Sequence, residues 1–257
     1  MQSNVLIYTV NEKICTITLD RPESLNSFNK QLRLDLLKAL QEAEADTDIR
    51  AIILNGAGKG FCAGADLAEG VEDGVEHQLR NEYKPCLMAI QNSSKPVIAQ
   101  VHGPAAGIGA AFALACDIVI MAEDAYMYLA FAAISLIPDG GLNWQLYNIL
   151  GPRRAFEIIA EGKRITAQEC LEYGMCNQIV PADELPETVK SRAEKLADGA
   201  PLAQAAVKQI LRQMENATLS DAIDMEASIQ KQLVETEDCK EAIAAFFRKE
   251  KPVFHGR

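Results

Sequence analysis

A chain of 257 residues, 49% of them hydrophobic and 24% charged, is long enough to bury a sizeable core. It suits one large domain, or a core with a small appendage. Its net charge of −11 argues against a non-specific nucleic-acid binder, because such a protein needs a basic face. Nucleic acid is therefore not an expected partner.

The seven cysteines are scattered, none forms a CxxC pair, and the sequence holds only three histidines. These counts give little support to a disulfide framework or a zinc site. We therefore expect no metal, and we interpret most cysteines as small core residues. The N-terminal residues lack a basic region followed by a long apolar run, and no stretch approaches the ~20 apolar residues that span a bilayer. We expect a cytoplasmic protein that does not bind a membrane.

Short apolar runs that end at turn residues predict strands, at residues 5–10, 14–19, 51–54, 97–101, 118–121 and 175–180. Apolar residues at helical spacing predict longer helices at positions 32–43, 75–90 and 142–150, with charges on the opposite face of the first. A shorter helix is expected at 110–115. Thr166 to Glu169 fits a capping box, with Gly174 as the end of that helix. This alternation favours a parallel sheet with helical crossovers.

The composition changes near Pro186. Three helical patterns follow, at residues 186–198, 201–215 and 220–247, with no convincing strand. We therefore expect two parts. Residues 1–185 form an α/β core that holds the site, and residues 186–257 form a helical section that packs on the core or on another subunit.

Two turns rich in small residues follow predicted strands, at residues 56–67 and 103–109. The second passes directly into a helix, and the start of a helix leaves several N–H groups unpaired. That end of a helix has a partial positive charge, so it suits an oxygen that is, or becomes, negative. The spacings fit neither a P-loop, nor a dinucleotide fingerprint, nor a GxSxG elbow. We interpret the two turns as one anion-stabilising site.

Asp139 lies just before a predicted helix, in the sequence LIPDGG. Asp is a favoured N-cap residue, so capping and acid–base chemistry are both open to it. Asp66 is open to a similar turn or cap role. Phe131 and Trp144, with Tyr128, either line a pocket near Asp139 or belong to the core.

Four separated motifs occur in a familiar order and spacing: RPESLNSFN at 21–29, GAGKGFCAGADL at 56–67, KPVIAQVHGPAAGIGAAFALACD at 95–117 and LIPDGG at 136–141. In these motifs, and over nearly its whole length, the chain resembles the crotonase (enoyl-CoA hydratase/isomerase) superfamily. The resemblance implies an α/β fold with a core of repeated ββα turns that form a spiral. It also implies a C-terminal helical section that forms homotrimers, often stacked as hexamers. The implied substrate is an acyl-CoA thioester, with no cofactor besides the coenzyme A that it contains.

Carried across by position, the resemblance assigns the oxyanion-hole donors to the backbone N–H groups of Ala65 and Ile108. It implies that residues 63–67 line the CoA groove and that a lysine near the end of the chain approaches the CoA phosphates, within the chain or from a neighbouring subunit. The substrate- and CoA-binding residues expected from the resemblance and from the pocket interpretation are Ala63, Gly64, Asp66, Leu67, Gly107, Gly109, Phe131, Trp144 and Lys249.

Two departures from the family pattern change the expected reaction. Typical hydratases of the family have two Glu residues, and the matching positions here are Ala111 and residues 131–133, none of which is acidic. Hydration then has no evident base to activate water. An Asp in IPDGG resembles the subgroup that contains the epoxyphenylacetyl-CoA isomerase, in which this Asp is the acid–base group.

We therefore expect an isomerase of an unsaturated or ring-bearing acyl-CoA, with Asp139 as the acid–base residue. Three alternatives stay open. One is a hydratase-type lyase that draws a carboxylate from another position. Another is a dehalogenase-like enzyme in which the same Asp is a nucleophile. The last is a catalytically silent acyl-CoA-binding or scaffold protein.

Overall fold

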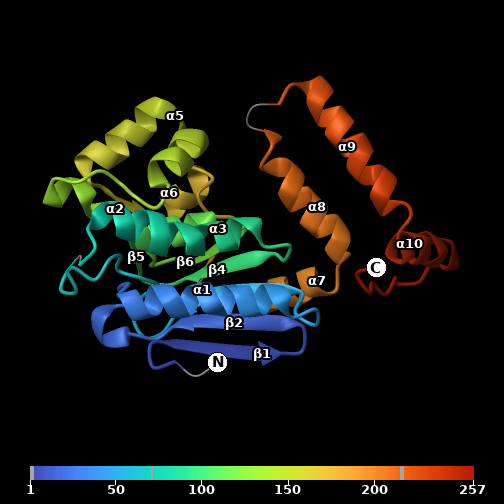
Figure 1. Ribbon diagram of the computed structural model, residues 1–257, viewed down its shortest axis with the longest axis horizontal. Coiled ribbons are helices and arrows are strands. Elements are labelled where there is room, and N and C mark those ends of the chain that lie inside the picture. Colours follow the sequence, from blue (N-terminus) through green and yellow to red (C-terminus); the bar gives the residue numbers. More distant parts are fainter. Residues whose placement is uncertain (1–2, 71, 215–216) are drawn as a thin grey trace.

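The computed structural model describes residues 3–70, 72–214 and 217–257, and a six-stranded sheet lies at its centre (Figure 1). The strands, in spatial order, are β1 (Leu6–Asn11), β2 (Ile14–Leu19), β3 (Ala51–Gly56), β4 (Val97–Val101), β6 (Ile118–Ala122) and β9 (Gln178–Val180). Only β1 and β2 are antiparallel. The predicted parallel sheet with helical crossovers is confirmed, because every later strand returns through a helix or a long connection.

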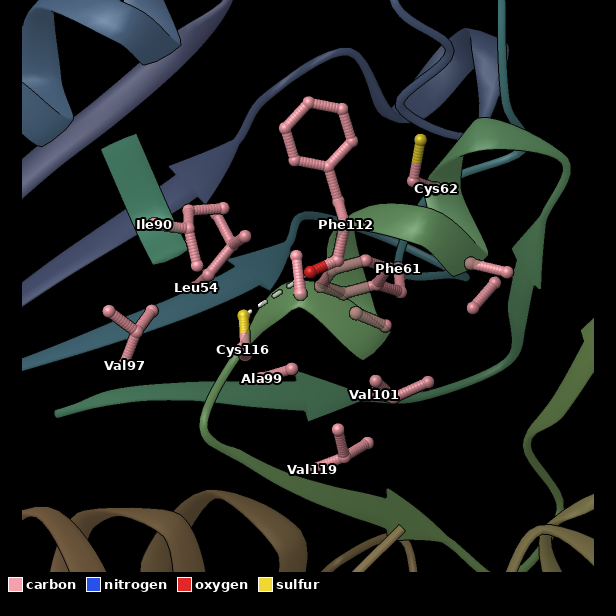
Figure 2. Close-up of a cluster of buried hydrophobic side chains, with 14 of the residues drawn as sticks. Leu54, Phe61, Cys62, Ile90, Val97, Ala99, Val101, Phe112, Cys116 and Val119 are labelled. Atoms are coloured by element: carbon pink, nitrogen blue, oxygen red, sulfur yellow. Dashed lines mark hydrogen bonds between the residues drawn. The ribbon is translucent and has the colours of Figure 1, made fainter. Parts of the chain in front are cut away.

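The central strands are buried on both faces, as their continuous apolar sequences require. Helix α4 (Ile108–Ala115) covers one face, and all of its residues except Leu114 are buried. Figure 2 shows this helix above β4, with Val97, Ala99 and Val101 directed toward it. Small residues let α4 pack closely on the sheet, and this close packing fixes where its first turn lies.

The helix α1 (Lys30–Ala45) buries the predicted stripe of residues 32, 36, 40 and 43, and Asn29 caps its start by accepting the Leu32 N–H at 2.9 Å. The predicted helix at 75–90 is found as three consecutive pieces, α2 (Val75–Gln78), a π-helical turn η2 (Leu79–Tyr83) and α3 (Lys84–Asn92). A π turn adds a residue to the local period, a change that a stripe of apolar residues does not reveal.

A second sheet of three short strands lies beside the first: β5 (Pro104–Ala106), β7 (Tyr126–Tyr128) and β8 (Arg164–Thr166). The sequence did not predict it, because three residues are too few to establish a period. Single 3₁₀ turns, η1 (Pro22–Ser24) and η3 (Ala130–Ile134), connect the larger elements. The strand β5 contains part of the second predicted turn, so this sheet helps to hold the site.

Helix α5 (Leu142–Glu161) is broken at Gly151, which has a non-helical φ of 73° and is followed by Pro152. Helix α6 (Ala167–Glu172) has the predicted capping box, in which Thr166 and Glu169 exchange bonds. Of the seven cysteines, all but Cys239 are buried, as expected for small core residues.

Helix α7 (Leu185–Ala197) packs against the main sheet and buries Leu185, Val189, Ala193 and Ala197. After it come α8 (Pro201–Leu211), α9 (Leu219–Leu233) and α10 (Glu237–Arg248), which extend away from the core in Figure 1. The division after residue 185 stays a prediction. Helix α7, the first helix after the predicted boundary, packs on the core, unlike the extended helices that follow it. None of the described helices is long and apolar enough to cross a membrane.

Two predicted C-terminal boundaries differ from those observed. The prediction of one helix over 220–247 is wrong, because Thr236 accepts the Cys239 N–H and starts a new helix, α10. The predicted helix 201–215 ends at Leu211, and the last residue of that prediction lies outside the described residues.

Candidate active site

The two predicted turns lie against each other. Cys62 donates its N–H to the Pro104 carbonyl at 3.1 Å, and Ala106 donates its N–H to the Cys62 carbonyl at 2.8 Å. These bonds attach the first turn to β5, the strand that leads into the second turn. The two turns, far apart in sequence, are therefore adjacent, as one anion-stabilising site would require.

Gly64 and Gly107 form one of the close approaches between the turns. Both have positive φ, 107° and 52°, and a Cβ on Gly64 would lie 3.1 Å from the Ala106 carbonyl oxygen and 3.6 Å from Gly107 Cα. A side chain at either position would be strained by its backbone conformation, and one at Gly64 would also press on the second turn. Glycine is required here because the two backbones touch.

The direction of the Ala65 N–H is set by its neighbours. Phe28 donates its N–H to the Gly64 carbonyl at 2.7 Å, and its own carbonyl accepts the Asp66 N–H at 3.0 Å. In a planar trans peptide the C=O and the next N–H point in opposite directions, so the Ala65 N–H points away from Phe28. Among the residues that the structure describes, no acceptor takes this N–H.

The second free donor is the N–H of Ile108, the first residue of α4. Gly107 precedes the helix, and its carbonyl accepts the Ala110 N–H at 3.1 Å, so the Ile108 N–H points out of the helix start. It too finds no acceptor in the described part of the chain. Two unpaired donors on touching turns, one at the positive end of a helix, form a place where a developing negative oxygen is stabilised.

Asp139 does not cap α5. The residue before that helix is Gly141, no side chain caps it, and Asp139 accepts the Leu142 N–H at 3.1 Å through its backbone carbonyl only. Its side-chain Oδ1 is buried and has no hydrogen-bond partner among the described residues. Burial raises the pKa of this carboxyl to about 6, against a smaller opposing effect of its own backbone.

Asp139 is adjacent to the start of α4. A Cβ on the next residue, Gly140, would lie 2.9 Å from both Ile108 Cγ1 and Ala111 Cβ, so the backbone after Asp139 packs directly on this helix. The segment that carries Asp139 therefore packs beside the first turn of α4. Ala111, where family hydratases have a Glu, is a fully buried packing residue.

A cavity of about 590 Å³ lies in front of Asp139. One wall comes from α2, η2 and α3 and includes Leu79, Leu87 and Met88, and the other is the segment 136–141. Asp139 is the one carboxylate among the lining residues that the structure describes, and Arg80 and Lys84 are the cations. Ala65 and Ile108 are not part of this lining, and none of the described lining residues belongs to either turn. The cavity is linked to the second turn through Gly140, which packs on the Ile108 side chain.

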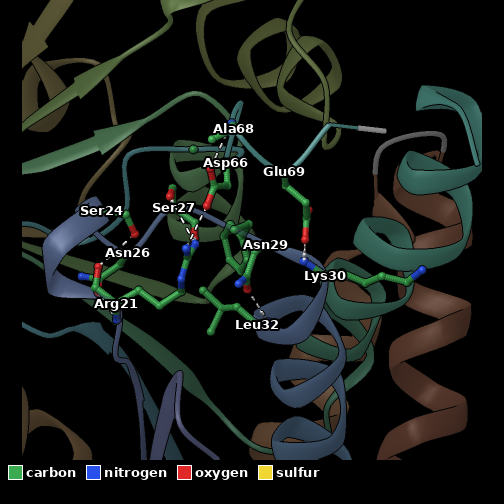
Figure 3. Close-up of polar contacts among 12 residues, drawn as sticks. Arg21, Ser24, Asn26, Ser27, Asn29, Lys30, Leu32, Asp66, Ala68 and Glu69 are labelled. Carbon is green, nitrogen blue, oxygen red and sulfur yellow. Dashed lines mark hydrogen bonds and ion pairs between the residues drawn. The ribbon is translucent and has the colours of Figure 1, made fainter. Parts of the chain in front are cut away.

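The other expected residues of the first turn have structural partners. Ala63 donates its N–H to the Leu25 carbonyl at 2.8 Å. The side chain of Asp66 forms an ion pair with Arg21 at 2.8 Å and accepts the Ala68 N–H at 3.1 Å (Figure 3). Its hydrogen bond to Arg21 lowers the pKa of this carboxyl. Asp66 thus has the bonds of a turn residue, and its expected ligand role stays a prediction. Leu67 is 76% exposed.

The remaining expected residues are distributed more widely. Gly109 lets α4 approach Cys62, because a Cβ there would lie 2.6 Å from the Cys62 carbonyl oxygen. Phe131 is buried with its ring beside Gly107, whereas Trp144 is 55% exposed on α5 and does not line the cavity. Lys249 ends α10, on the side of the molecule opposite α2 (Figure 1), so one chain does not bring it to the cavity. A ligand role for these residues stays a prediction.

Sequence reasoning missed a buried charged group beside the site. Arg33 is 3% exposed and bonds to Glu82 at 2.6 Å and to Glu69 at 2.9 Å. The apolar stripe predicts charges on the opposite, solvent-facing side of the helix, yet Arg33 lies three residues before Leu36 and shares its buried face. The position of Arg33 in the helical period indicates burial, whereas its charge suggests exposure.

Residues 9–257 match the family described as enoyl-CoA hydratase/isomerase. The chain is 38% identical to a protein named "Probable enoyl-CoA hydratase" from Rhodobacter capsulatus, over 100% of both chains. It is 36% identical to the 1,2-epoxyphenylacetyl-CoA isomerase of Escherichia coli, over 96% of this chain and 97% of that one. The crystal structure of an enoyl-CoA hydratase from Bacillus anthracis superposes with a TM-score of 0.94 at 32% identity, over 99% of this chain and 100% of that one. The fold is thus the crotonase fold, and the chain belongs to the enoyl-CoA hydratase/isomerase family.

Proposed function

We propose that the protein isomerises an unsaturated or ring-bearing acyl-CoA thioester. The thioester oxygen binds between the N–H groups of Ala65 and Ile108, which stabilise the enolate formed when a proton leaves carbon. Asp139 takes that proton and returns it elsewhere on the conjugated system, so one carboxylate serves both steps. Donors of this kind are commonly worth about 3–4 kcal/mol each in the transition state.

The observation that supports this proposal best is the unpartnered, buried Oδ1 of Asp139 in the wall of the cavity. A polar oxygen without a partner is costly to bury, which argues for a ligand or reaction that uses it. A carboxyl with a pKa near 6 is also available in both protonation states around neutral pH. An acid–base residue that must accept and then donate a proton needs this property.

Isomerisation is favoured over hydration by the set of carboxylates. Hydration requires a base that activates water and an acid that protonates carbon. Asp139 is the single carboxylate found among the described lining residues, and Ala111 leaves no acid on α4. The name of the Escherichia coli relative, 1,2-epoxyphenylacetyl-CoA isomerase, agrees with a ring-bearing substrate.

A screen of acyl-CoA esters in D₂O, with isomerised, hydrated and hydrolysed products scored together by mass spectrometry, tests the proposal. We expect an isomerised product from at least one unsaturated ester. The Asp139→Asn variant should lose about 10²-fold or more in turnover with nearly unchanged ester binding, because it removes proton transfer alone. Asp124→Asn, a change at an exposed acid, is the matched control. Undiminished turnover by Asp139→Asn would refute the acid–base role.

Hydration is the second candidate, favoured by the name of the Rhodobacter capsulatus relative. Loss of the enoyl absorbance of crotonyl-CoA, with a mass gain of one water, would decide for it. Tight binding of esters without turnover across the whole panel would instead indicate a silent acyl-CoA-binding protein. Transfer of ¹⁸O from labelled water into the enzyme would indicate the nucleophilic, dehalogenase-like use of Asp139.

We also propose that the chain acts as a homotrimer or a hexamer of two trimers. Large apolar side chains are exposed on α8, α9 and α10, among them Leu211, Leu219, Phe246 and Phe247 at 65–79%. Exposed apolar surface on this scale indicates a protein contact. Light scattering after gel filtration measures the mass directly, and a monomer at micromolar concentration would overturn this assignment.

A further inference from the structure

Arg33 connects three separate segments of the chain through one buried guanidinium. Its Nε donates to Glu82 at 2.6 Å, its Nη2 donates to Glu69 at 2.9 Å and its Nη1 donates to the Phe28 carbonyl at 3.0 Å. The guanidinium carbon lies 5.1 Å from the centre of the Tyr83 ring. Burial lowers the pKa of Arg33, but Tyr83, Glu82 and Glu69 outweigh that effect and the net shift is upward, so the side chain stays charged.

The bond to Phe28 links Arg33 to the proposed oxyanion hole. The Phe28 carbonyl also accepts the Asp66 N–H, and the Phe28 N–H holds the Gly64 carbonyl. These two bonds define the peptide planes on either side of Ala65. A cation on the Phe28 carbonyl restrains the one residue that orients the Ala65 N–H.

The bond to Glu69 restrains the same turn at its other end. Glu69 accepts the N–H of Lys30 at the start of α1 (Figure 3), and its own N–H donates to the Asp66 carbonyl at 3.2 Å. Ala65 is therefore held from both sides, by Phe28 before α1 and by Glu69 after the turn. Both Phe28 and Glu69 accept hydrogen bonds from Arg33.

The bond to Glu82 extends this network to the cavity. Glu82 and Tyr83 belong to η2, whose first residue, Leu79, lines the cavity, as does Lys84 directly after η2. The Tyr83 ring packs edge-on to Phe28 at 5.8 Å and lies 6.5 Å from the ring of Phe112 on α4. One side chain thus fixes the turn and the cavity wall relative to each other.

Net stability is a weak explanation for this buried group. Desolvation of buried charges offsets much of their attraction, and a well-packed apolar replacement is often as stable. We propose that Arg33 is a positioning residue, which orients the Ala65 N–H toward the substrate carbonyl and holds η2 in register with it. This inference depends on the oxyanion hole of the proposed function.

The test measures the hole directly, without requiring isomerisation. A conjugated dienoyl-CoA bound to the protein reports hydrogen bonds to its thioester oxygen as a lowered carbonyl stretching frequency. We expect the natural protein to lower this frequency and Arg33→Met to lose most of that shift. Arg33→Lys should retain part of it, because the ammonium group keeps the charge but lacks the planar set of donors of a guanidinium. Turnover should fall about 10- to 100-fold in Arg33→Met, with KM nearly unchanged, as for a weakened oxyanion donor.

Lys208→Met is the matched control. Lys208 is another largely covered cation, with a side chain that is 9% exposed. It is held by the Ile90 and Lys95 carbonyls at 3.0 Å and by Asp117 at 2.6 Å, away from both turns. We expect the Lys208→Met variant to have a lower Tm than the natural protein and the same carbonyl frequency in the bound ester. Should Arg33→Met not fold, Glu82→Gln is the substitute, because it keeps the guanidinium and weakens one of its contacts. We expect Glu82→Gln to lower the carbonyl frequency less than the natural protein does. The same frequency in this variant and in the natural protein would count against the inference.

The outcomes separate the two proposals. A natural protein that leaves the carbonyl frequency unchanged has no oxyanion hole, and the proposed function fails with it. A natural protein that lowers the frequency, together with an Arg33→Met variant that does so equally and keeps its kcat, overturns only the role of Arg33.

Discussion

At the scale of single residues, the environment of a carboxyl group decides what it can do. Asp66 and Asp139 were open to the same local interpretation from sequence, a turn or cap residue. Asp66 pairs with Arg21, which lowers the pKa of its carboxyl. Asp139 is half-buried, its Oδ1 has no hydrogen-bond partner among the described residues, and burial raises the pKa of its carboxyl. Their difference arises from contacts between segments that are distant in sequence, so local sequence could not separate them.

The raised pKa of Asp139 predicts the acid limb of the pH–rate profile. Below about pH 6 the carboxyl is protonated and cannot accept a proton from carbon, so kcat/KM should fall about tenfold for each pH unit. Measurement from pH 4.5 to 8 with an isomerised ester gives the apparent pKa. A profile that stays flat down to pH 5 would contradict this role of the carboxyl.

The same shift predicts that Asp139→Asn stabilises the fold. Between about pH 4 and 6 the folded state binds more protons at this site than the unfolded state, so the free energy of unfolding falls as pH rises. Above pH 6 the decrease in the free energy of unfolding is constant, at most about 3 kcal/mol. Urea unfolding should show the variant more stable than the natural protein at pH 7.5 and equal to it near pH 3.5. Greater stability of the natural protein at pH 7.5 would contradict the burial of a charged carboxylate.

At the scale of elements, regular patterns were predicted and contacts between elements were not. The strands β2 and β4 follow from β-branched runs, and the capping box of α6 follows from its four residues. The second sheet has strands of three residues and no period to detect. Arg33 was missed because its burial depends on Glu69 and Glu82 arriving from other segments.

The contact between the two turns predicts the effect of Gly64→Ala. The added methyl would lie 3.1 Å from the Ala106 carbonyl oxygen, and the φ of 107° is unfavourable for alanine, at a cost of order 1–3 kcal/mol. Because the turns must separate to admit it, turnover should fall by about 10²-fold, as when one oxyanion donor is lost. Thermal unfolding and kcat on one ester measure both effects.

Gly174→Ala supplies the control for backbone strain. Gly174 also has positive φ, 74°, but a Cβ there would meet nothing within 4 Å. Both variants should lose stability, and only Gly64→Ala should lose turnover. Equal turnover in the two variants would show that the distance between the turns does not matter to the reaction.

At the scale of the whole molecule, one chain leaves its C-terminal helices poorly covered. No described residue of α8 or α9 is fully buried, and in α10 only Asp238 and Ala245 are. The sequence predicted helices after residue 186, and it could not predict that α9 and α10 would extend from the core rather than fold over it (Figure 1). Helical periodicity defines an apolar face and does not identify the surface that covers it.

This arrangement predicts how Lys249 acts, if it contacts coenzyme A. Within one chain α10 lies opposite α2 (Figure 1), so Lys249 can only reach the site of a neighbouring subunit. Lys249→Gln should raise KM about two- to fivefold for a CoA ester, as expected for one exposed charge pair. KM should not change for the matching pantetheine ester, which lacks the phosphoadenosine group. Mixed oligomers of Lys249→Gln and Asp139→Asn subunits should restore the lower KM, because a site then combines Asp139 from one subunit with Lys249 from the next. An unchanged KM for the CoA ester would remove Lys249 from the site.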